Sequence, residues 1–283
     1  MGTLVRLLRT PKGAVGLILV ASFIILGLLA PVISPTNPQK QNISLRNRPP
    51  LFHAADGRVY LLGTDELGRD LLTRTLFGVR LSLLIGFCAV ACSGTIGVFL
   101  GVLSGFQGGV IDFVVMRAVD AQLSIPLILL AMMWIAFTKP SLPNVLAVII
   151  LAGWVQYARP IRAMTLTLRS SGFVEAAHAI GVPRWRIYLR HILPNVLPLA
   201  VVISTLQLAG AILMEGSLSF LGVGLQPPAA ALGLMVNSGR RYIDTAWWIC
   251  TFPGLALMLI VLGVYFMGDA LRDTLDPKLR RLG

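Results

Sequence analysis

The stretch Ser171-Gly-Phe-Val-Glu-Ala-Ala-His-Ala-Ile-Gly-Val-Pro183 separates two apolar blocks and decides how the chain is organised. Its first two residues can start a helix that continues over 173–180. Gly181 can take the left-handed conformation that ends a helix, and Pro183 suits the first turn of the next one. Crossing a bilayer requires no such element, so the stretch predicts a docking surface outside the membrane.

The apolar blocks on either side, and others along the chain, are long enough to cross a membrane. Of the 283 residues 56% are hydrophobic and 13% are charged, and a soluble domain would carry roughly twice that charged fraction. The hydropathy pattern predicts an all-α, polytopic membrane protein with six transmembrane helices. The spans are expected at about 14–33, 81–104, 114–137, 144–159, 196–221 and 248–268, and the fourth is short for a span.

Basic residues at the ends of these blocks predict the orientation. The net charge of +12 does not form one stripe, which argues against nucleic acid as a partner. Arginines and lysines gather before the first span, after the fourth and after the sixth, so both termini are expected in the cytoplasm. The first external loop, about 34–80, is also basic, but longer loops obey this rule poorly. Within it, Thr64 or Asp65 is expected to cap a short helix that leads into the second span.

These patterns divide the chain into four parts. They are a cytoplasmic amino terminus (1–13), a first transmembrane helix with its external loop (14–80), a five-helix core (81–268) with a cytoplasmic loop at about 160–195, and a cytoplasmic tail (269–283).

The second span carries small residues at regular spacing. Gly97, Gly101 and Gly105 form two overlapping G-x-x-x-G patterns, which let helices approach closely in lipid. Packing within this chain is the favoured interpretation, and a seam between two subunits is the alternative.

Charged residues inside the spans are few, which makes each a candidate for a pathway or gating role. Arg117 and Asp120 are spaced i, i+3 and can pair on one helix face. Glu215 has no charged neighbour in sequence, so it is expected to face a wet cavity, a partner helix, or Arg240 and Arg241. Direct contact with a substrate is the other interpretation.

Catalytic and metal-binding patterns are missing from the sequence. There is no G-x-x-x-x-G-K-[ST] phosphate loop, no H-E-x-x-H and no G-x-S-x-G. The three histidines show no ligand spacing, and the three cysteines include no C-x-x-C pair. We therefore predict a non-catalytic chain with no metal site and no cofactor of its own.

The residues alone leave two interpretations of the loop after the fourth span. Glu175 lies in the first turn of its short helix, where a carboxylate is favoured, and the alanines around it make the helix thin enough for close contact. A second, arginine-bearing helix should follow until Pro194 interrupts it. The loop is then either an amphipathic element on lipid headgroups or a lever that transmits motion.

The same loop resembles the E-A-A-x-x-x-G-(x9)-I-x-L-P signature of permeases in ATP-binding-cassette (ABC) importers. His191 replaces the isoleucine and resembles the H-x-L-P-N form of the peptide-importer branch. Leu62–Asp70, Ser219–Pro228 and Leu275–Arg280 are similar to other segments of that branch, whereas Leu232 stands where the family often has tryptophan.

The resemblance is strongest to the second of the two permeases (the C-type permease) of dipeptide, oligopeptide and nickel importers, and it implies the type I ABC importer permease fold in a bacterial inner membrane. The implied partners are a homologous second permease, two cytoplasmic ATPase subunits that bind ATP and Mg, and an external solute-binding protein. The residues implied in ATPase coupling are Glu175, Ala176, Ala177, Gly181, Pro183, Leu193 and Pro194.

Several substrates fit such a permease. Di- and oligopeptides lead, while nickel chelates, glutathione, opines and sugars use similar proteins. A self-contained secondary transporter is the alternative from another class, but it would favour inverted repeats and buried ion ligands, and no internal repeat is visible.

Overall fold

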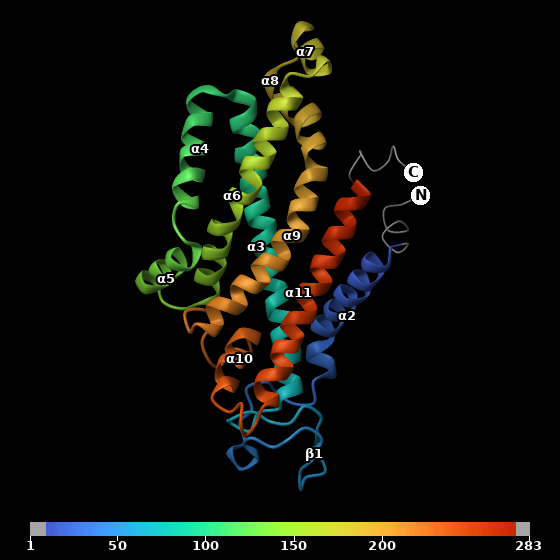
Figure 1. The fold of residues 1–283 in the computed structure, drawn as a ribbon, viewed down its shortest axis with the longest axis vertical. Helices are drawn as coiled ribbons and strands as arrows, with labels where there is room; N and C mark the ends of the chain where they lie inside the picture. Colours follow the sequence, from blue (N-terminus) through green and yellow to red (C-terminus); the bar gives the residue numbers. More distant parts are fainter. Residues whose placement is uncertain (1–9, 276–283) are drawn as a thin grey trace.

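The computed structural model describes residues 10–275, which form a bundle of long helices with a small irregular cap at one end (Figure 1). Five helices are long and apolar enough to cross a membrane, and one bent helix pair is a sixth candidate. The predicted helical membrane fold is therefore confirmed. The helices are α2 (Pro11–Ile33), α3 (Leu71–Gln107), α4 (Gly109–Leu123), α5 (Leu127–Thr138), α6 (Leu142–Arg169), α7 (Gly172–Ala179), α8 (Arg184–Ile187), α9 (Leu193–Phe220), α10 (Leu232–Arg240) and α11 (Trp248–Leu275).

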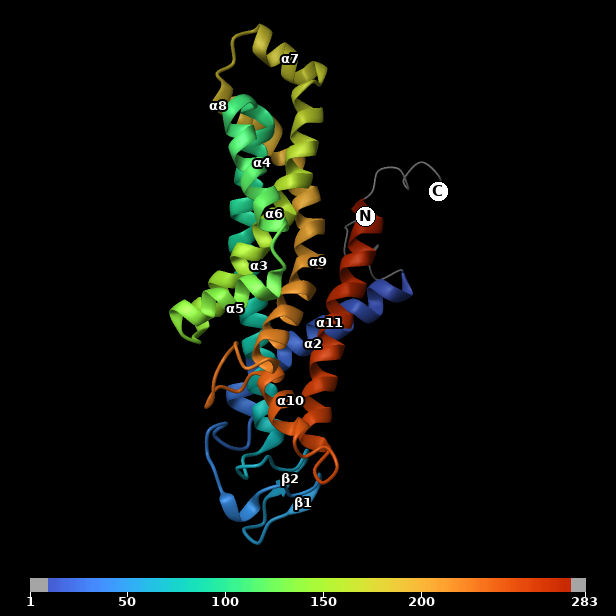
Figure 2. The ribbon, with the colours of Figure 1, turned by 60° about the vertical axis from the view of Figure 1, so that its left-hand side comes forward.

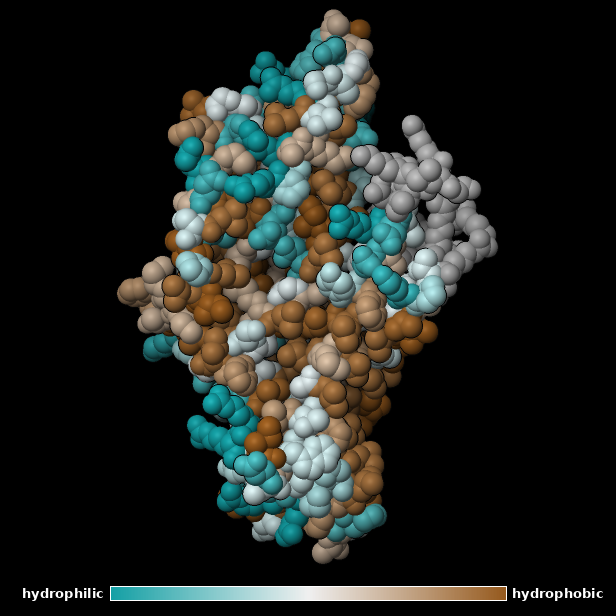
Figure 3. Space-filling view, in the orientation of Figure 1, coloured by the Kyte–Doolittle hydropathy of each residue, from teal (hydrophilic) through white to brown (hydrophobic). Residues whose placement is uncertain are grey.

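The surface has the layering expected of a membrane protein. Hydrophobic residues dominate the middle of the face in Figure 3, and hydrophilic residues gather toward its two ends. α7 lies at one end and the cap at the other, and the described ends of α2 and α11 point toward the α7 end (Figures 1 and 2). Residues 1–9 of the predicted amino terminus and residues 276–283 of the predicted tail, which include most of the tail motif, lie outside the described residues.

The third predicted span is not one helix. α4 and α5 meet at 91° across a short break that contains Ile125 and Pro126. Proline disfavours helical geometry in the residue before it and provides no backbone N–H of its own, so the chain turns here although the apolar run continues. A hydropathy window averages the residues on both sides of such a break. The prediction of one continuous helix over 114–137 was therefore wrong.

Two other boundaries also differ from the prediction. α6 has 28 residues and passes through Pro160, so the fourth span is not short. α3 begins at Leu71, and Asp70 rather than Thr64 or Asp65 caps it: the Asp70 carboxylate accepts a hydrogen bond from the Thr73 amide at 2.9 Å.

Pro194 does not interrupt the second helix of the loop, contrary to expectation. α8 leads through a π-helical turn, η2 (Tyr188–Ile192), directly into α9, and Pro194 occupies the first turn of α9. The wider π-helical turn accommodates Pro194, which has no backbone N–H to donate, so the helix continues. The Asn195 side chain also donates to the His191 carbonyl, at 2.6 Å.

α3 and α6 form the central helix pair of the bundle. A Cβ atom added at Gly97, Gly101 or Gly105 would lie 2.4, 2.7 or 2.9 Å from a backbone carbonyl oxygen of α6. The G-x-x-x-G face of α3 therefore packs against a helix of the same chain. α2 packs on α11 in a similar way, with Gly16 against the backbone of Met267.

The cap consists of the chain from Ser34 to Asp70 and is mostly irregular. It contains a 3₁₀ turn, η1 (Ile43–Leu45), and an antiparallel hairpin of β1 (Phe52–His53) and β2 (Val59–Tyr60). Burial raises the pKa of the Tyr60 phenol, and the nearby Asp56 carboxylate adds to the rise.

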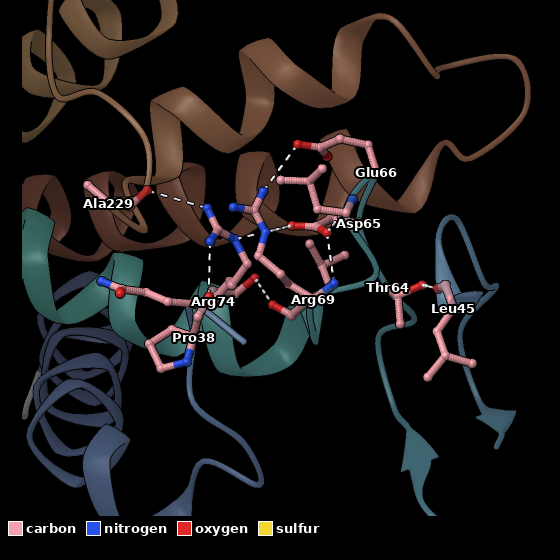
Figure 4. A network of polar contacts seen from close by, with 12 residues as sticks. Pro38, Leu45, Thr64, Asp65, Glu66, Arg69, Arg74 and Ala229 are labelled. Carbon is pink, nitrogen blue, oxygen red and sulfur yellow. Dashed lines mark hydrogen bonds and ion pairs between the residues drawn. The ribbon is translucent and has the colours of Figure 1, made fainter. Parts of the chain in front are cut away.

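A buried charged network holds the cap to the helices (Figure 4). The Asp65 carboxylate accepts hydrogen bonds from the Arg69 amide at 2.9 Å and the Arg69 Nε at 2.6 Å, and it lies 3.4 Å from the Arg74 Nε. Arg74 also donates to the carbonyls of Pro38 and Ala229, which joins the cap to the segment before α10. These charges are buried but paired, so the network favours one fixed position of the cap.

Candidate functional site

The short helix α7 stands beyond the membrane-length helices, at the end where α6 finishes and α8 begins (Figure 2). Val174 and Ala177, spaced i, i+3, are its buried residues and join a cluster that includes Phe106 of α3 and Ile187 of α8. The opposite side is exposed and carries Glu175. α7 is thus fixed on one side and open on the other.

Aromatic contacts attach α7 to two of the long helices. The His178 ring stacks on Phe106, near the end of α3, with ring centroids 6.2 Å apart. Phe173 contacts His191, in the π-helical turn that leads into α9, with ring centroids 6.4 Å apart. α7 therefore contacts the end of α3 and the turn that leads into α9.

The turn after α7 has the geometry that its sequence indicates. Gly181 has a φ of +77°, which favours glycine, and its amide donates to the His178 carbonyl at 3.0 Å. Pro183 precedes the first residue of α8, where its carbonyl accepts from the Arg186 and Ile187 amides. The turn closes tightly without filling the space around Gly181.

The predicted coupling residues do not all lie on one surface. Exposed positions are occupied by Glu175, Ala176, Gly181, Pro183 and Pro194, whereas Ala177 is buried and Leu193 is partly buried. Ala177 lies on the inner face of α7 beside Val174, while Ala176 lies on the exposed side. Leu193 and Pro194 are the first two residues of α9, where the loop joins that helix.

The charged residues of α4 pair with α6. Arg117 and Asp120 are 4.0 Å apart, but the Asp120 carboxylate also accepts a closer hydrogen bond from Arg159 of α6. A second pair, which the sequence reasoning missed, joins Asp112 to Arg162, and Asp112 also accepts from Ser104 of α3. The signal for it was an acidic residue in the first turn of α4 and an arginine 50 residues later.

Glu215 is fully buried between α9 and α3. Its two carboxylate oxygens accept from the Ser82 hydroxyl at 3.0 Å and the Ser219 hydroxyl at 2.9 Å. Glu215 therefore faces a neighbouring helix, α3, which was one of the expected surroundings. Within the described chain it forms no ion pair with Arg240 or Arg241. The Ser219 oxygen accepts from the Leu225 amide, so Glu215 also fixes the loop that leads to α10.

Within residues 10–275, no group of three or more histidine, cysteine, aspartate or glutamate side chains could hold a metal ion. What the fold provides is a set of membrane-length helices with a rigidly attached helix outside them. These features are those of a polytopic membrane protein with a helical element outside the membrane-length helices.

The comparisons with known proteins assign the family. A family model described as the binding-protein-dependent transport system inner membrane component matches residues 97–281. A second, the N-terminal TM domain of oligopeptide transport permease C, matches residues 3–50. The chain belongs to the family of inner membrane components of binding-protein-dependent transport systems, and it is a permease subunit of an ABC importer.

Two relatives agree with this family, and a solved structure shares the fold. The chain is 37% identical to the dipeptide transport system permease protein DppC of Haemophilus influenzae, over 95% of this chain and 92% of the relative. It is 40% identical to the di/tripeptide transport system permease protein DppC of Pseudomonas aeruginosa, over 95% of this chain and 89% of the relative. A chain of the inward-facing MetNI methionine ABC transporter has a TM-score of 0.56 and 23% identity, covering 72% of this chain and 96% of that one, and supports the fold.

Proposed function

We propose that this chain forms half of a translocation pathway for di- and oligopeptides and that α7 couples the pathway to a cytoplasmic ATPase subunit. The observation that carries the coupling role is the two-sided construction of α7. Its inner face is packed against α3 and α8, while Glu175 and its neighbours remain free for a partner. The peptide assignment is supported by the names of the relatives.

In this proposal a homologous second permease completes the pathway, and two ATPase subunits bind ATP and Mg below it. ATP binding closes the ATPases, and α7 transmits the closure to α3 and α9 so that the pathway opens outward. An external solute-binding protein delivers the substrate, and hydrolysis restores the inward-facing state. Such a cycle requires two packings that the partners stabilise differently. A nickel chelate, glutathione or another small solute is the alternative cargo.

The coupling role is tested by Glu175→Lys in the complete complex, reconstituted in liposomes with its solute-binding protein. Reversing the charge on the free face of α7 should lower ATP-dependent peptide uptake at least tenfold, which corresponds to about 1.4 kcal/mol at an interface. Hydrolysis by the ATPase subunits should continue without transport.

Asp273→Lys is the matched control, because Asp273 is also an exposed carboxylate and lies in the last turns of α11. It should transport normally. Wild-type uptake by the Glu175→Lys complex, with normal assembly, would contradict the coupling role of α7.

A further inference from the structure

A pocket of about 160 Å³ opens among α3, α6 and α9 beside the start of α5. Three polar side chains line it: Ser93 of α3, Gln156 of α6 and Gln207 of α9. Much of the remaining lining is small, and a Cβ atom added at Gly210 would meet only the Gln207 Oε1, at 3.8 Å. The small residues keep space in front of the two carboxamides.

The pocket lies at the middle depth of the bundle. Gln156 is halfway along α6 (Leu142–Arg169), and Gln207 is halfway along α9 (Leu193–Phe220). The two helices run in opposite directions, α6 toward the α7 end and α9 away from it (Figure 1). Both glutamines therefore lie in the middle of helices that are long enough to cross a membrane.

Neither carboxamide has a hydrogen-bond partner in the part of the chain that the structure describes. Gln122, which lies on α4, shows the contrast: its side chain donates to the Leu151 carbonyl and accepts from the Trp154 indole, the latter at 2.8 Å. An unpaired amide facing lipid costs several kcal/mol, on the order of 2–7, so polar side chains at this depth face a bundle interior or a wet cavity. Gln156 is exposed on this chain and Gln207 is half-buried, so each carboxamide needs a hydrogen-bond partner that lipid does not supply.

The lining of the pocket contains no ionisable side chain. A carboxamide offers both donors and an acceptor, which is the same set that a peptide group presents. A neutral site of this kind binds a peptide main chain in a way that does not depend on the charge of its side chains. It also holds the cargo without the strong attraction of a buried charge, which would slow its release.

We propose that Gln156 and Gln207 form a neutral hydrogen-bonding station for the main chain of a peptide crossing the membrane. This rests on the proposed function, since it assigns residues to the pathway that the permease forms. The ligand class is uncharged amide groups, and the two glutamines act together from facing helices.

The test uses the complete complex in liposomes, with saturating solute-binding protein so that delivery is equal for all peptides. Gln156→Leu and Gln207→Leu each remove a carboxamide with little change in volume, and each should lower dipeptide uptake about tenfold or more, as expected when a substrate amide loses its partner. Binding-protein-stimulated ATP hydrolysis should persist. Gln207→Asn keeps the carboxamide and should retain most of the uptake.

Gln207→Glu separates a pathway contact from a structural role. A carboxylate in the neutral pocket should favour peptides with a lysine side chain over those with a glutamate side chain by about fivefold relative to the wild type, because opposite charges attract more strongly away from bulk water. A residue that only packs against a second permease would change assembly or total activity without changing this ratio.

The outcomes distinguish the two proposals. A wild-type complex that takes up no peptide would overturn the proposed function. Normal wild-type uptake with unchanged uptake by both leucine variants, or with an unchanged charge preference in Gln207→Glu, would overturn the glutamine station alone. Loss of stimulated ATP hydrolysis together with loss of uptake in the asparagine variant would also overturn it, in favour of a structural role.

Discussion

At the scale of single residues, the absence of a side chain sets how closely α3 and α6 approach. The added Cβ at Gly97 would lie 2.4 Å from the Trp154 carbonyl oxygen and 2.6 Å from the Tyr157 Cβ. Real Cβ atoms do not approach backbone so closely, so even alanine forces the helices apart. Lipid provides no hydrophobic drive that would hold a poorly fitting pair together.

We expect Gly97→Ala to destabilise the protein by about 1–3 kcal/mol, the usual cost of overpacking. Each kcal/mol corresponds to roughly 2–4 °C in thermal stability for a chain of this general size. Melting of the purified protein in mild detergent measures the change. Gly254→Ala is the control, since its Cβ would meet only the Val236 side chain at 3.8 Å. Equal melting of the two variants would contradict the close α3–α6 contact.

The spacing of these glycines was visible in the sequence, but their partner helix was not. The same holds for Glu215, whose burial could be expected from its place in an apolar run, whereas Ser82 lies 133 residues away along the chain. Spacing reports which residues share a face of one helix. It carries no information on which other helix meets that face.

At the scale of elements, the cap depends on a single carboxylate more than on its short strands. Asp65 accepts from the Arg69 side chain and from the amides of Leu67 and Arg69, and it also lies beside Arg74. Both guanidinium groups are buried. Removing the negative charge leaves Arg74 buried with only carbonyl acceptors and leaves Arg69 with Glu66 as its remaining anionic partner.

Asp65→Asn should therefore loosen the cap, since breaking a buried ion pair typically costs about 3–5 kcal/mol. The measurement is limited proteolysis of the segment 34–70, which should become sensitive while the membrane helices stay resistant. Asp56→Asn serves for comparison, because its pair with Arg58 is exposed and should contribute no more than about 1 kcal/mol. A protease-resistant Asp65→Asn protein would show that the network is not what fixes the cap.

Elements were predicted well where hydropathy and chain breaks coincide, and poorly where they do not. The short helix of the loop was predicted between a serine and the glycine and proline that follow it, and α7 forms there. Pro126, Pro160 and Pro194 have three different outcomes: a sharp bend, a continuous helix and a helix start after a wider turn. Which outcome occurs depends on neighbouring helices that supply or block hydrogen bonds, and a single sequence does not show them.

At the scale of the whole molecule, the structure shows that two of the basic residues in the first loop are held in buried ion pairs. Arg69 and Arg74 are buried against Asp65, and Arg69 also contacts Glu66. Other basic residues of the loop, such as Arg46 and Arg48, are exposed. The exposed arginines of α8 lie at the end of the molecule opposite the cap, next to α7.

We therefore expect the cap to face outward and α7 to face the cytoplasm. In a variant whose three native cysteines are replaced by alanine, Asp56→Cys lies in the hairpin of the cap and Ser170→Cys lies just before α7, both exposed. A membrane-impermeant maleimide should label the first in right-side-out vesicles and the second only after permeabilisation. The reverse pattern would place α7 outside, away from any ATPase, and would refute its coupling role together with the orientation. Labelling of both cysteines without permeabilisation would place the two ends on one side of the membrane. That result would contradict a bundle in which α3, α6 and α9 span the membrane.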